Sequence, residues 1–391
     1  MGQNQFRIRV YIGRDKDGKK QYINCYGNTQ REAEKKALEV RKQLDKGLDI
    51  TARDDTFHMW AQRFLSMKET EVSQKELENL KGRIAKFETL YSIPVNKLRA
   101  QDFQDILIAL AKENPKTHKP TAKRTLKGYK EAAKQVMQQA LFNRVIDFNP
   151  LDAVVAKGIV PPQKRRALTD EEQRWIIDTP HRARRAAMIM MFSGLRLGEL
   201  VPLGWNDIDL NKCEIKVDKS VEYPKNVPIL KEGGKTENST RIVNVPRILV
   251  DFLRDEKRKD LQDGKINMLV CPDSRGKMYT KSGWRALWES YLMDLNIQYG
   301  HSVRNNGAPV TSKYIRERVV LTIPPFTAHW LRHTFATMLY LAGVNVEVAK
   351  EQLGHSDIKT TLNIYTHLDK IYKIKNMNKL DDYISRRQAE N

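Results

Sequence analysis

The segment VPPQKRR, residues 160–166, divides the chain into two regions of different character, and this division limits the folds available to it. Two consecutive prolines have no amide hydrogen to donate, and the basic residues after them favour solvent, so the segment is typical of a linker. Before it the hydrophobic pattern is mostly helical, and after it helices mix with short strands. A chain of 391 residues also exceeds what one core commonly organises. We therefore expect a multidomain protein with a boundary close to residue 165.

Residues 1–50 predict a small β-sheet with one packed helix. Apolar and polar residues alternate in FRIRVYIG and again in QYINCYG, and the Asp-Gly turn between them favours a hairpin. A helix should follow, with Thr29 as its N-cap, Glu32 completing a capping box and Gly47 ending it. With 12 basic and 7 acidic residues, this region is positively charged.

Residues 51–160 predict an all-helical bundle, because apolar residues recur there at spacings of three and four. The last helix of this bundle carries a row of lysines on the face opposite its apolar side: Lys123, Lys127, Lys130 and Lys134. Such a row is usually a solvated face. The preceding loop, KENPKTHKP, adds more lysines with few acidic partners, so we interpret the row as a contact to DNA phosphates.

The overall charge also points to a polyanionic partner. The formal net charge is +21, from 69 Lys and Arg against 48 Asp and Glu, which favours binding to nucleic acid. Three separated cysteines (Cys25, Cys213 and Cys271) can form neither a disulfide framework nor a local thiolate metal site, which suits a reducing cytoplasm. The chain shows no signal peptide and no apolar run near the roughly 20 residues of a membrane span, so we expect a cytoplasmic protein.

Residues 165–391 predict a mainly helical α+β domain, because short strands such as CEIKVDKSVEY and TRIVNVP interrupt the helices irregularly. In SGLRLGEL an apolar helix should break at Ser193 and Gly194 and place Arg196 before a second apolar helix. Arg196 could form a structural salt bridge with Glu199 or Asp207, or it could serve function, and these two interpretations stand even.

Further polar residues lie at positions suited to chemistry. Lys235, in KEGGKTENSTRIVNVP, should lie at the tip of a hairpin, from which a flexible ammonium can reach into a groove. His329 and Arg332 are three residues apart on a predicted helix and should therefore share one face.

The segment that follows predicts two more helices. Gly354 should end a helix as its C′ residue, which would hold His355 at a helix terminus. Ser356 could then cap a short helix that ends at Tyr365.

These residue types suit phosphodiester cleavage without a metal. The non-bridging oxygens and the charge that develops on them need fixed cations, for which Arg196 and Arg332 are suitable. A tyrosine that forms a covalent phosphoester conserves the bond energy, so rejoining needs no ATP; Tyr365 is the candidate. Lys235 can protonate the leaving 5′ oxygen, and the histidines can donate hydrogen bonds or move protons.

The motifs SGLRLGEL, KTENSTR, HWLRHTFAT and LGHSDIKTTLNIYTH together resemble the signature boxes of the tyrosine recombinases, the phage integrase family, in order and spacing. The resemblance implies that Arg196 and Arg332 bind the phosphate, that Lys235 is the general acid and that Tyr365 is the nucleophile. It assigns the two histidine positions of the family to His329 and His355.

The resemblance also implies an organisation. Residues 1–50 would be an arm-type DNA-binding domain like those of integrases from phages and conjugative transposons, residues 51–160 a helical core-binding domain, and residues 165–391 the catalytic domain. The expected activity is integration and excision of a mobile element through a 3′-phosphotyrosyl intermediate, by a homotetramer on double-stranded DNA. DNA-bending or directionality proteins could assist, and no cofactor is expected.

Three alternatives remain from the sequence. A type IB topoisomerase shares this chemistry, but the arm-like first domain favours an integrase. A non-catalytic DNA-binding regulator would have no need of Tyr365. The pair His329 and His333 has the spacing of a zinc site, but Trp330 stands where a metalloprotease has glutamate.

Two further segments carry expectations. Residues 368–387 predict a terminal amphipathic helix, which either covers its own core or docks on a neighbouring subunit. Residues 291–325 are longer and more basic than a minimal family member requires.

Overall fold

The computed structural model describes residues 6–14, 17–52, 54–160, 166–232, 240–265, 267–304, 306–313 and 319–365. The chain divides into two compact units, Met1–Gln163 and Lys164–Asn391, and the division falls within the predicted linker. None of the helices within these ranges is both long and apolar enough to cross a membrane.

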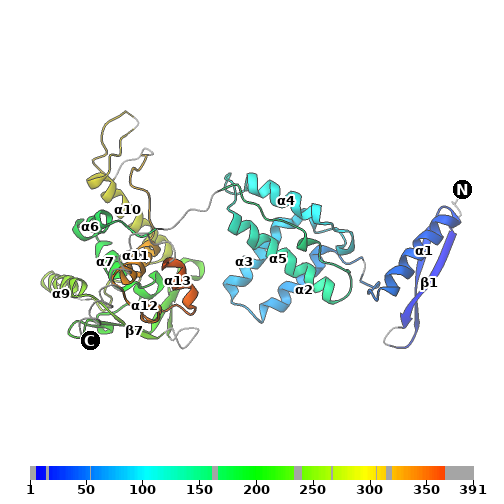
Figure 1. The fold of residues 1–391 in the computed structure, drawn as a ribbon, viewed down its shortest axis with the longest axis horizontal. Coiled ribbons are helices and arrows are strands. Elements are labelled where there is room, and N and C mark those ends of the chain that lie inside the picture. The colour runs from blue at the N-terminus through cyan, green and yellow to red at the C-terminus, as the bar shows by residue number, and fades with distance from the viewer. Residues whose placement is uncertain are drawn as a thin grey trace, which may run out of the picture. The chain divides into compact units, whose positions relative to one another are not determined.

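The first unit begins with the predicted hairpin and helix (Figure 1). Strands β1 (Phe6–Arg14) and β2 (Lys20–Gly27) pair antiparallel, and helix α1 (Gln30–Asp45) covers one face of the pair. Thr29 caps α1 by accepting a 3.2 Å hydrogen bond from Glu32 N, as predicted. The Glu32 carboxylate, however, accepts from Asn28 N and not from Thr29 N, so the predicted box is displaced by one residue.

The predicted helical bundle follows in the same unit. It consists of α2 (Phe57–Glu69), α3 (Gln74–Ile84), α4 (Ala100–Lys112) and α5 (Lys123–Phe142), with 3₁₀ turns η1 (Ala85–Leu90), η2 (Val95–Lys97) and η3 (Pro150–Asp152). Helix α5 packs against α2, α3 and α4 because its apolar stripe, which includes Leu126, Val136 and Met137, is fully buried.

The second unit is built around helix α7 (Arg184–Ser193), whose side chains from Ala186 to Ser193 are all buried. Around it lie α6 (Asp170–Asp178), α9 (Arg247–Gln262) and α11 (Ala328–Leu341). Helix α10 (Lys281–Tyr299) contributes Trp284, Trp288 and Tyr291 to the same core. The short helices α8 (Leu197–Leu200), α12 (Val346–Leu353) and α13 (Ile358–Tyr365) complete the helical part.

Two small sheets lie in this unit. Strands β3 (Ile208–Asp209), β4 (Glu214–Val217) and β7 (Arg241–Asn244) form an antiparallel sheet in the order β3-β4-β7. Strands β5 (Lys219–Glu222) and β6 (Ile229–Glu232) form a separate hairpin, with η5 (Pro224–Asn226) between them. The predicted fold class, a small sheet with a helix, an all-helical bundle and a mainly helical α+β domain, is confirmed.

The long segment before His329 divides between a helix and a loop. Its first part extends α10 to Tyr299, and the remainder crosses back to α11 without regular structure in its described residues. The buried Asn296 side chain accepts a 2.9 Å hydrogen bond from Ile323 N and a 3.4 Å bond from Ser302 Oγ. This loop is therefore attached to α10 at both of its ends.

Candidate active site

Arg196 lies at the N-cap of α8, two residues after the left-handed Gly194 that ends α7. Its guanidinium donates to Glu199 Oε1 at 2.8 Å and to the carbonyl oxygen of Gly354 at 2.7 Å. Of the two predicted salt-bridge partners, Glu199 is the one found, because Asp207 pairs with Lys219 at 2.7 Å. The Arg196 side chain nevertheless stays 44% exposed, so an external anion can reach it.

Arg332 lies in the interior of the protein. It is 4% exposed, whereas His329, three residues earlier on α11, is exposed, and both residues line one cavity with Arg196. Arg332 Nη1 donates to the carbonyl of Gly194 at 2.6 Å, and Nη2 donates to the carbonyl of Leu353. Burial, together with the charge of Arg196, lowers the pKa of Arg332 to about 9, which leaves it a cation at pH 7.

Three arginines converge on the end of α12. The carbonyls of Gln352, Leu353 and Gly354 accept hydrogen bonds from Arg241, Arg332 and Arg196 respectively. Carbonyls at a helix C-terminus have no partner within the helix and carry partial negative charge, so they attract cations. The end of α12 therefore gathers arginines from three distant segments.

Gly354 makes this convergence possible. Its φ of 60° is left-handed, as predicted for a C′ residue, and His355 N closes the turn by donating to the carbonyl of Lys350 at 3.1 Å. A Cβ on Gly354 would lie 2.8 Å from Arg241 Nη1 and 2.9 Å from Arg241 Cζ. Only glycine leaves room for that guanidinium.

One carboxylate lies among these cations. Glu199 accepts hydrogen bonds from Arg196 and, through both oxygens, from Arg241 at 3.2 and 3.0 Å. Burial by itself would raise the pKa of Glu199, but Arg241 and then Arg196 lower it to about 2. Three arginines against one carboxylate leave an excess of positive charge, which is suited to an anion such as a phosphodiester.

His355 is half-buried beside this cluster. Its Nδ1 lies 2.9 Å from Thr361 Oγ1 on α13, and burial followed by the charges of Arg332 and Arg196 lowers its pKa to about 4. His355 is therefore neutral at pH 7, and a neutral imidazole can accept a proton or a hydrogen bond. His329, in the first turn of α11, lines a cavity of about 610 Å³ together with Arg196 and Arg332.

Of the other two predicted catalytic residues, the structure describes the position of Tyr365 along the chain but does not describe Lys235. Tyr365 is the last residue of α13, one helical turn after Thr361. The helix is capped by Asp357, whose carboxylate accepts from Lys359 N, and not by Ser356 as predicted. Lys235 and the predicted terminal helix lie outside the described residues. The strands on either side of Lys235 in the sequence, β6 and β7, belong to different sheets, and the placement of Lys235 at a hairpin tip stays a prediction.

Arg241 was not singled out from the sequence, although it lies in the motif KTENSTR. The signal available was an arginine at the start of an alternating strand, on the same side as the apolar Val243. A charged residue on the buried face of a strand needs a buried partner.

The four lysines predicted to contact DNA from α5 fall into two pairs, one exposed and one bound to other groups of the protein. Lys123 and Lys127 are exposed, and within the described part of the chain neither has an ion-pair partner. Lys130, by contrast, donates to the carbonyl of Val154 at 2.7 Å, and Lys134 pairs with Asp152 at 2.6 Å.

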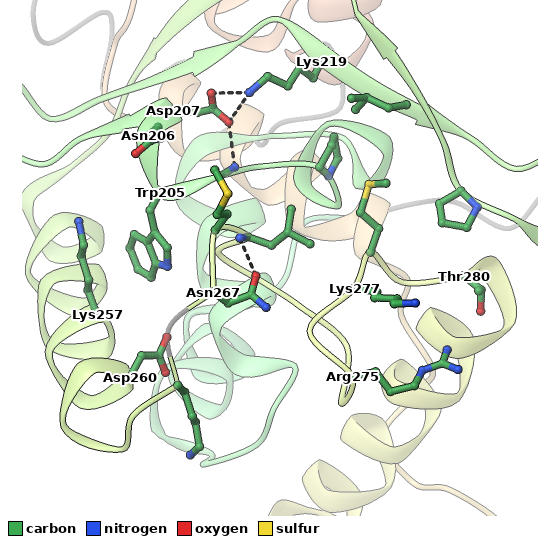
Figure 2. Close-up of a pocket in the computed structure, with 18 of the residues that line it drawn as sticks. Trp205, Asn206, Asp207, Lys219, Lys257, Asp260, Asn267, Arg275, Lys277 and Thr280 are labelled. Carbon is green, nitrogen blue, oxygen red and sulfur yellow. Dashed lines mark hydrogen bonds and ion pairs between the residues drawn. The ribbon is translucent and has the colours of Figure 1, made fainter.

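A separate apolar cavity of about 890 Å³ lies elsewhere in the second unit (Figure 2). It is lined by Trp205 and Met268, with amines such as Lys257 at its edge, and none of the described catalytic candidates borders it. Among the residues that the structure places, no group of three His, Cys, Asp or Glu side chains could hold a metal ion.

Comparison with known proteins relates this site to one family. Residues 166–371 match the phage integrase family. The chain is 26% identical to a XerC-like tyrosine recombinase of Caldanaerobacter subterraneus, over 97% of each chain. It is 23% identical to the ICEBs1 integrase of Bacillus subtilis, over 97% of this chain and 98% of that one.

Solved structures share the fold. An integrase of the transposon Tn1549, in complex with transposon right-end DNA, aligns with a TM-score of 0.63 and 19% identity over 82% of this chain and 99% of that chain. A lambda integrase tetramer bound to a Holliday junction aligns with a TM-score of 0.53 and 18% identity, over 95% of this chain and 98% of that one.

Proposed function

The chain belongs to the phage integrase family, and from this membership we propose how its residues divide the work of site-specific recombination. The protein is a tyrosine recombinase: it cleaves and rejoins DNA in the recombination of a mobile element. The observation that carries the assignment of residues is the meeting of Arg196 and Arg332 at the C-terminus of α12, next to His355.

In this proposal the two arginines bind the scissile phosphate. Arg196 is exposed and can donate hydrogen bonds to a non-bridging oxygen, while the buried Arg332 supplies a fixed positive charge deeper in the site. Both stabilise the charge that develops on the phosphorane oxygens, and since their positions are set by protein carbonyls, little reorganisation is needed during the reaction. His329, exposed in the same cavity, donates a hydrogen bond to the phosphate.

The covalent step is a transfer between two oxygens. The phenol oxygen of Tyr365 forms a bond to phosphorus as the bond from phosphorus to the 5′ oxygen breaks, which leaves a 3′-phosphotyrosyl linkage and a free 5′ hydroxyl. Neutral His355 accepts the phenol proton, and Lys235 protonates the leaving 5′ oxygen. The reverse sequence, with a 5′ hydroxyl from another strand, rejoins the DNA.

The first unit supplies the remaining DNA contacts in this proposal. Residues 51–160 act as the core-binding domain, with Lys123, Lys127, Lys130 and Lys134 toward the phosphates. Residues 1–50 act as an arm-type domain that binds a second DNA site, and residues 165–391 act as the catalytic domain.

The proposal for the arm-type domain is supported by the exposed face of its hairpin. Cross-strand pairs on that face join Arg7 to Tyr26, Arg9 to Asn24 and Tyr11 to Tyr22, and all six residues are exposed. Arginine and asparagine are the side chains that most often read base edges, and two-stranded ribbons fit the major groove.

We further propose that the protein works as a homotetramer on two double-stranded sites, helped by DNA-bending or directionality proteins, in the cytoplasm. The likeness to a lambda integrase that is tetrameric on a Holliday junction supports this assembly.

The decisive experiment traps the covalent intermediate on a nicked crossover substrate. Wild-type protein should give a denaturation-resistant adduct, whereas Tyr365→Phe should bind the same DNA equally well and give none. Tyr340→Phe, on α11, serves as the matched control and should still form the adduct. An adduct with Tyr365→Phe, or its loss from wild-type protein on addition of a chelator, would contradict the proposal.

A further inference from the structure

Arg241, the first residue of β7, has no role in the proposed reaction, yet it contacts residues that hold the proposed catalytic groups in place. Its side chain is 5% exposed, and its guanidinium donates to both oxygens of Glu199 and, through Nε, to the carbonyl of Gln352 at 3.2 Å. Arg241 does not line the cavity that Arg196, His329 and Arg332 share, and Gln352 and Glu199 engage its three nitrogens, so it is not placed as those residues are to meet an incoming phosphate.

The partners of Arg241 are the residues that hold the phosphate-binding groups. The Glu199 carboxylate accepts two hydrogen bonds from Arg196, one from the Arg196 backbone amide at 2.9 Å and one from the Arg196 guanidinium at 2.8 Å. Gln352 precedes Leu353 and Gly354, whose carbonyls hold Arg332 and Arg196, and His355 follows directly. Arg241 therefore joins the start of α8 to the end of α12.

Arg241 is also close to Lys235 in the sequence. Arg241 follows Lys235 by six positions in the sequence, and β7 is fixed to β4 by regular pairing. A second link joins β7 to α12: the backbone amide of Asn244 donates to Gln352 Oε1 at 2.9 Å. Strand β7, which follows Lys235 in the sequence, is thus attached to α12, the helix that ends just before His355.

We infer that Arg241 is a positioning residue for strand cleavage: acting through Glu199 and the carbonyl of Gln352, it sets where Arg196 and His355 face the scissile phosphate. This inference rests on the proposed function. Without Arg241, the Glu199 carboxylate keeps only Arg196 as a cationic partner and draws that guanidinium away from the phosphate. The end of α12 also loses one of its three arginine attachments.

The test compares Arg241 with a second arginine held by carboxylates and a carbonyl. Arg185, in α7, is partly buried, pairs with Glu256 at 3.0 Å and Asp260 at 2.7 Å, and donates to the carbonyl of Val270, but it lies outside the catalytic cluster. Arg241→Met and Arg185→Met should both lower the melting temperature. In single-turnover cleavage at saturating DNA, measured below both melting temperatures, Arg241→Met should lose about 100-fold, since misplaced groups cost this much. Arg185→Met should cleave at the wild-type rate.

Two further measurements separate positioning from mere support of the fold. Arg241→Lys should restore stability more than cleavage, because an ammonium cannot reproduce the bidentate contact to Glu199. In a Glu199→Gln background, Arg241→Met should lose a much smaller factor than in wild type, because both changes interrupt the same path.

The outcomes distinguish this inference from the proposed function. Equal cleavage by the Arg241→Met and Arg185→Met proteins, or the same loss in both Glu199 backgrounds, would overturn it. If wild-type protein itself formed no covalent adduct, the proposed function would fail instead.

Discussion

Arg196 donates a 2.7 Å hydrogen bond to the carbonyl of Gly354, a residue 158 positions further along the chain. This bond joins the loop after α7 to the turn after α12, and so connects an exposed arginine to the residue directly before His355. The position of the cation and the position of the imidazole are therefore set together.

Arg196 and Arg332 should differ in what they contribute to stability. Replacement of either by alanine should reduce cleavage by about 10²–10³-fold, because each removes a fixed cation from the transition state. Arg332→Ala should also destabilise the fold by about 1–3 kcal/mol, since it leaves the carbonyls of Gly194 and Leu353 without their donor.

Single-turnover cleavage and thermal denaturation measure the two effects separately. Arg254→Ala, on the surface of α9, should change neither quantity. Wild-type cleavage by Arg196→Ala, or an unchanged melting temperature for Arg332→Ala, would contradict this prediction.

Gly354→Ala should impair both stability and cleavage. The left-handed backbone costs an alanine about 1–2 kcal/mol, and the new Cβ would press on the Arg241 guanidinium. Gly264, after α9, is the matched control, because its φ is also left-handed at +68° but a Cβ there would meet nothing within 4 Å. Gly264→Ala should lose similar stability and keep full cleavage; equal cleavage by both variants would show that the Arg241 contact has no effect.

His355 should titrate well below an ordinary histidine. Its pKa is lowered from 6.5 to about 4, so between these values the unfolded chain binds the proton and the folded protein does not. The stability contributed by neutral His355 is therefore fully present above pH 6.5 and is lost as the pH falls toward 4. DNA should raise this pKa, because a phosphate favours the imidazolium.

An NMR titration, with His355→Gln used to assign the resonance, checks this behaviour. A midpoint near the ordinary value of 6.5 in the free protein would contradict the prediction, as would a midpoint that DNA lowers.

The lysines of α5 should contribute unequally to DNA affinity. Lys123 and Lys127 are exposed, so their replacement by glutamine should weaken binding and reduce the slope of log affinity against log salt by about 0.9 for each phosphate that is no longer neutralised. Lys130 and Lys134 already bind Val154 and Asp152, so their replacement should change the slope less. Salt titrations of the two double variants test this; equal reductions of the slope would contradict the unequal contribution, and slopes unchanged from wild type in both would return the row to an ordinary solvated face.

The exposed face of the hairpin should be needed for recombination but not for cleavage. Arg9→Ala with Asn24→Ala should abolish protection of a second DNA site, while cleavage of a short crossover substrate continues. Arg41→Ala, on the exposed side of α1, is the control and should leave protection intact. Footprints confined to the crossover sequence in wild-type protein would mean that residues 1–50 serve another role.

Local patterns in the sequence were sufficient for the fold class and for many helix ends. Alternation predicted β1 and β2, and the spacing of apolar residues predicted the bundle, because each pattern records which face of one element is buried. Gly354 was recognisable as a helix end since the left-handed conformation depends on its own backbone. The cap of α13 was placed one residue early, at Ser356, because adjacent Ser and Asp are both able to cap.

The motifs around Arg196, Arg332, His355 and Tyr365 could likewise be read from the sequence, because residue types and short spacings are local properties. Only the tertiary structure decided that Arg332 is buried, that Lys130 and Lys134 are engaged within the protein, and that Arg241 binds Glu199. Each of these facts depends on which acceptor a long side chain reaches. The acceptors lie up to 138 residues away in the sequence, and only packing of the folded chain brings them within hydrogen-bonding distance.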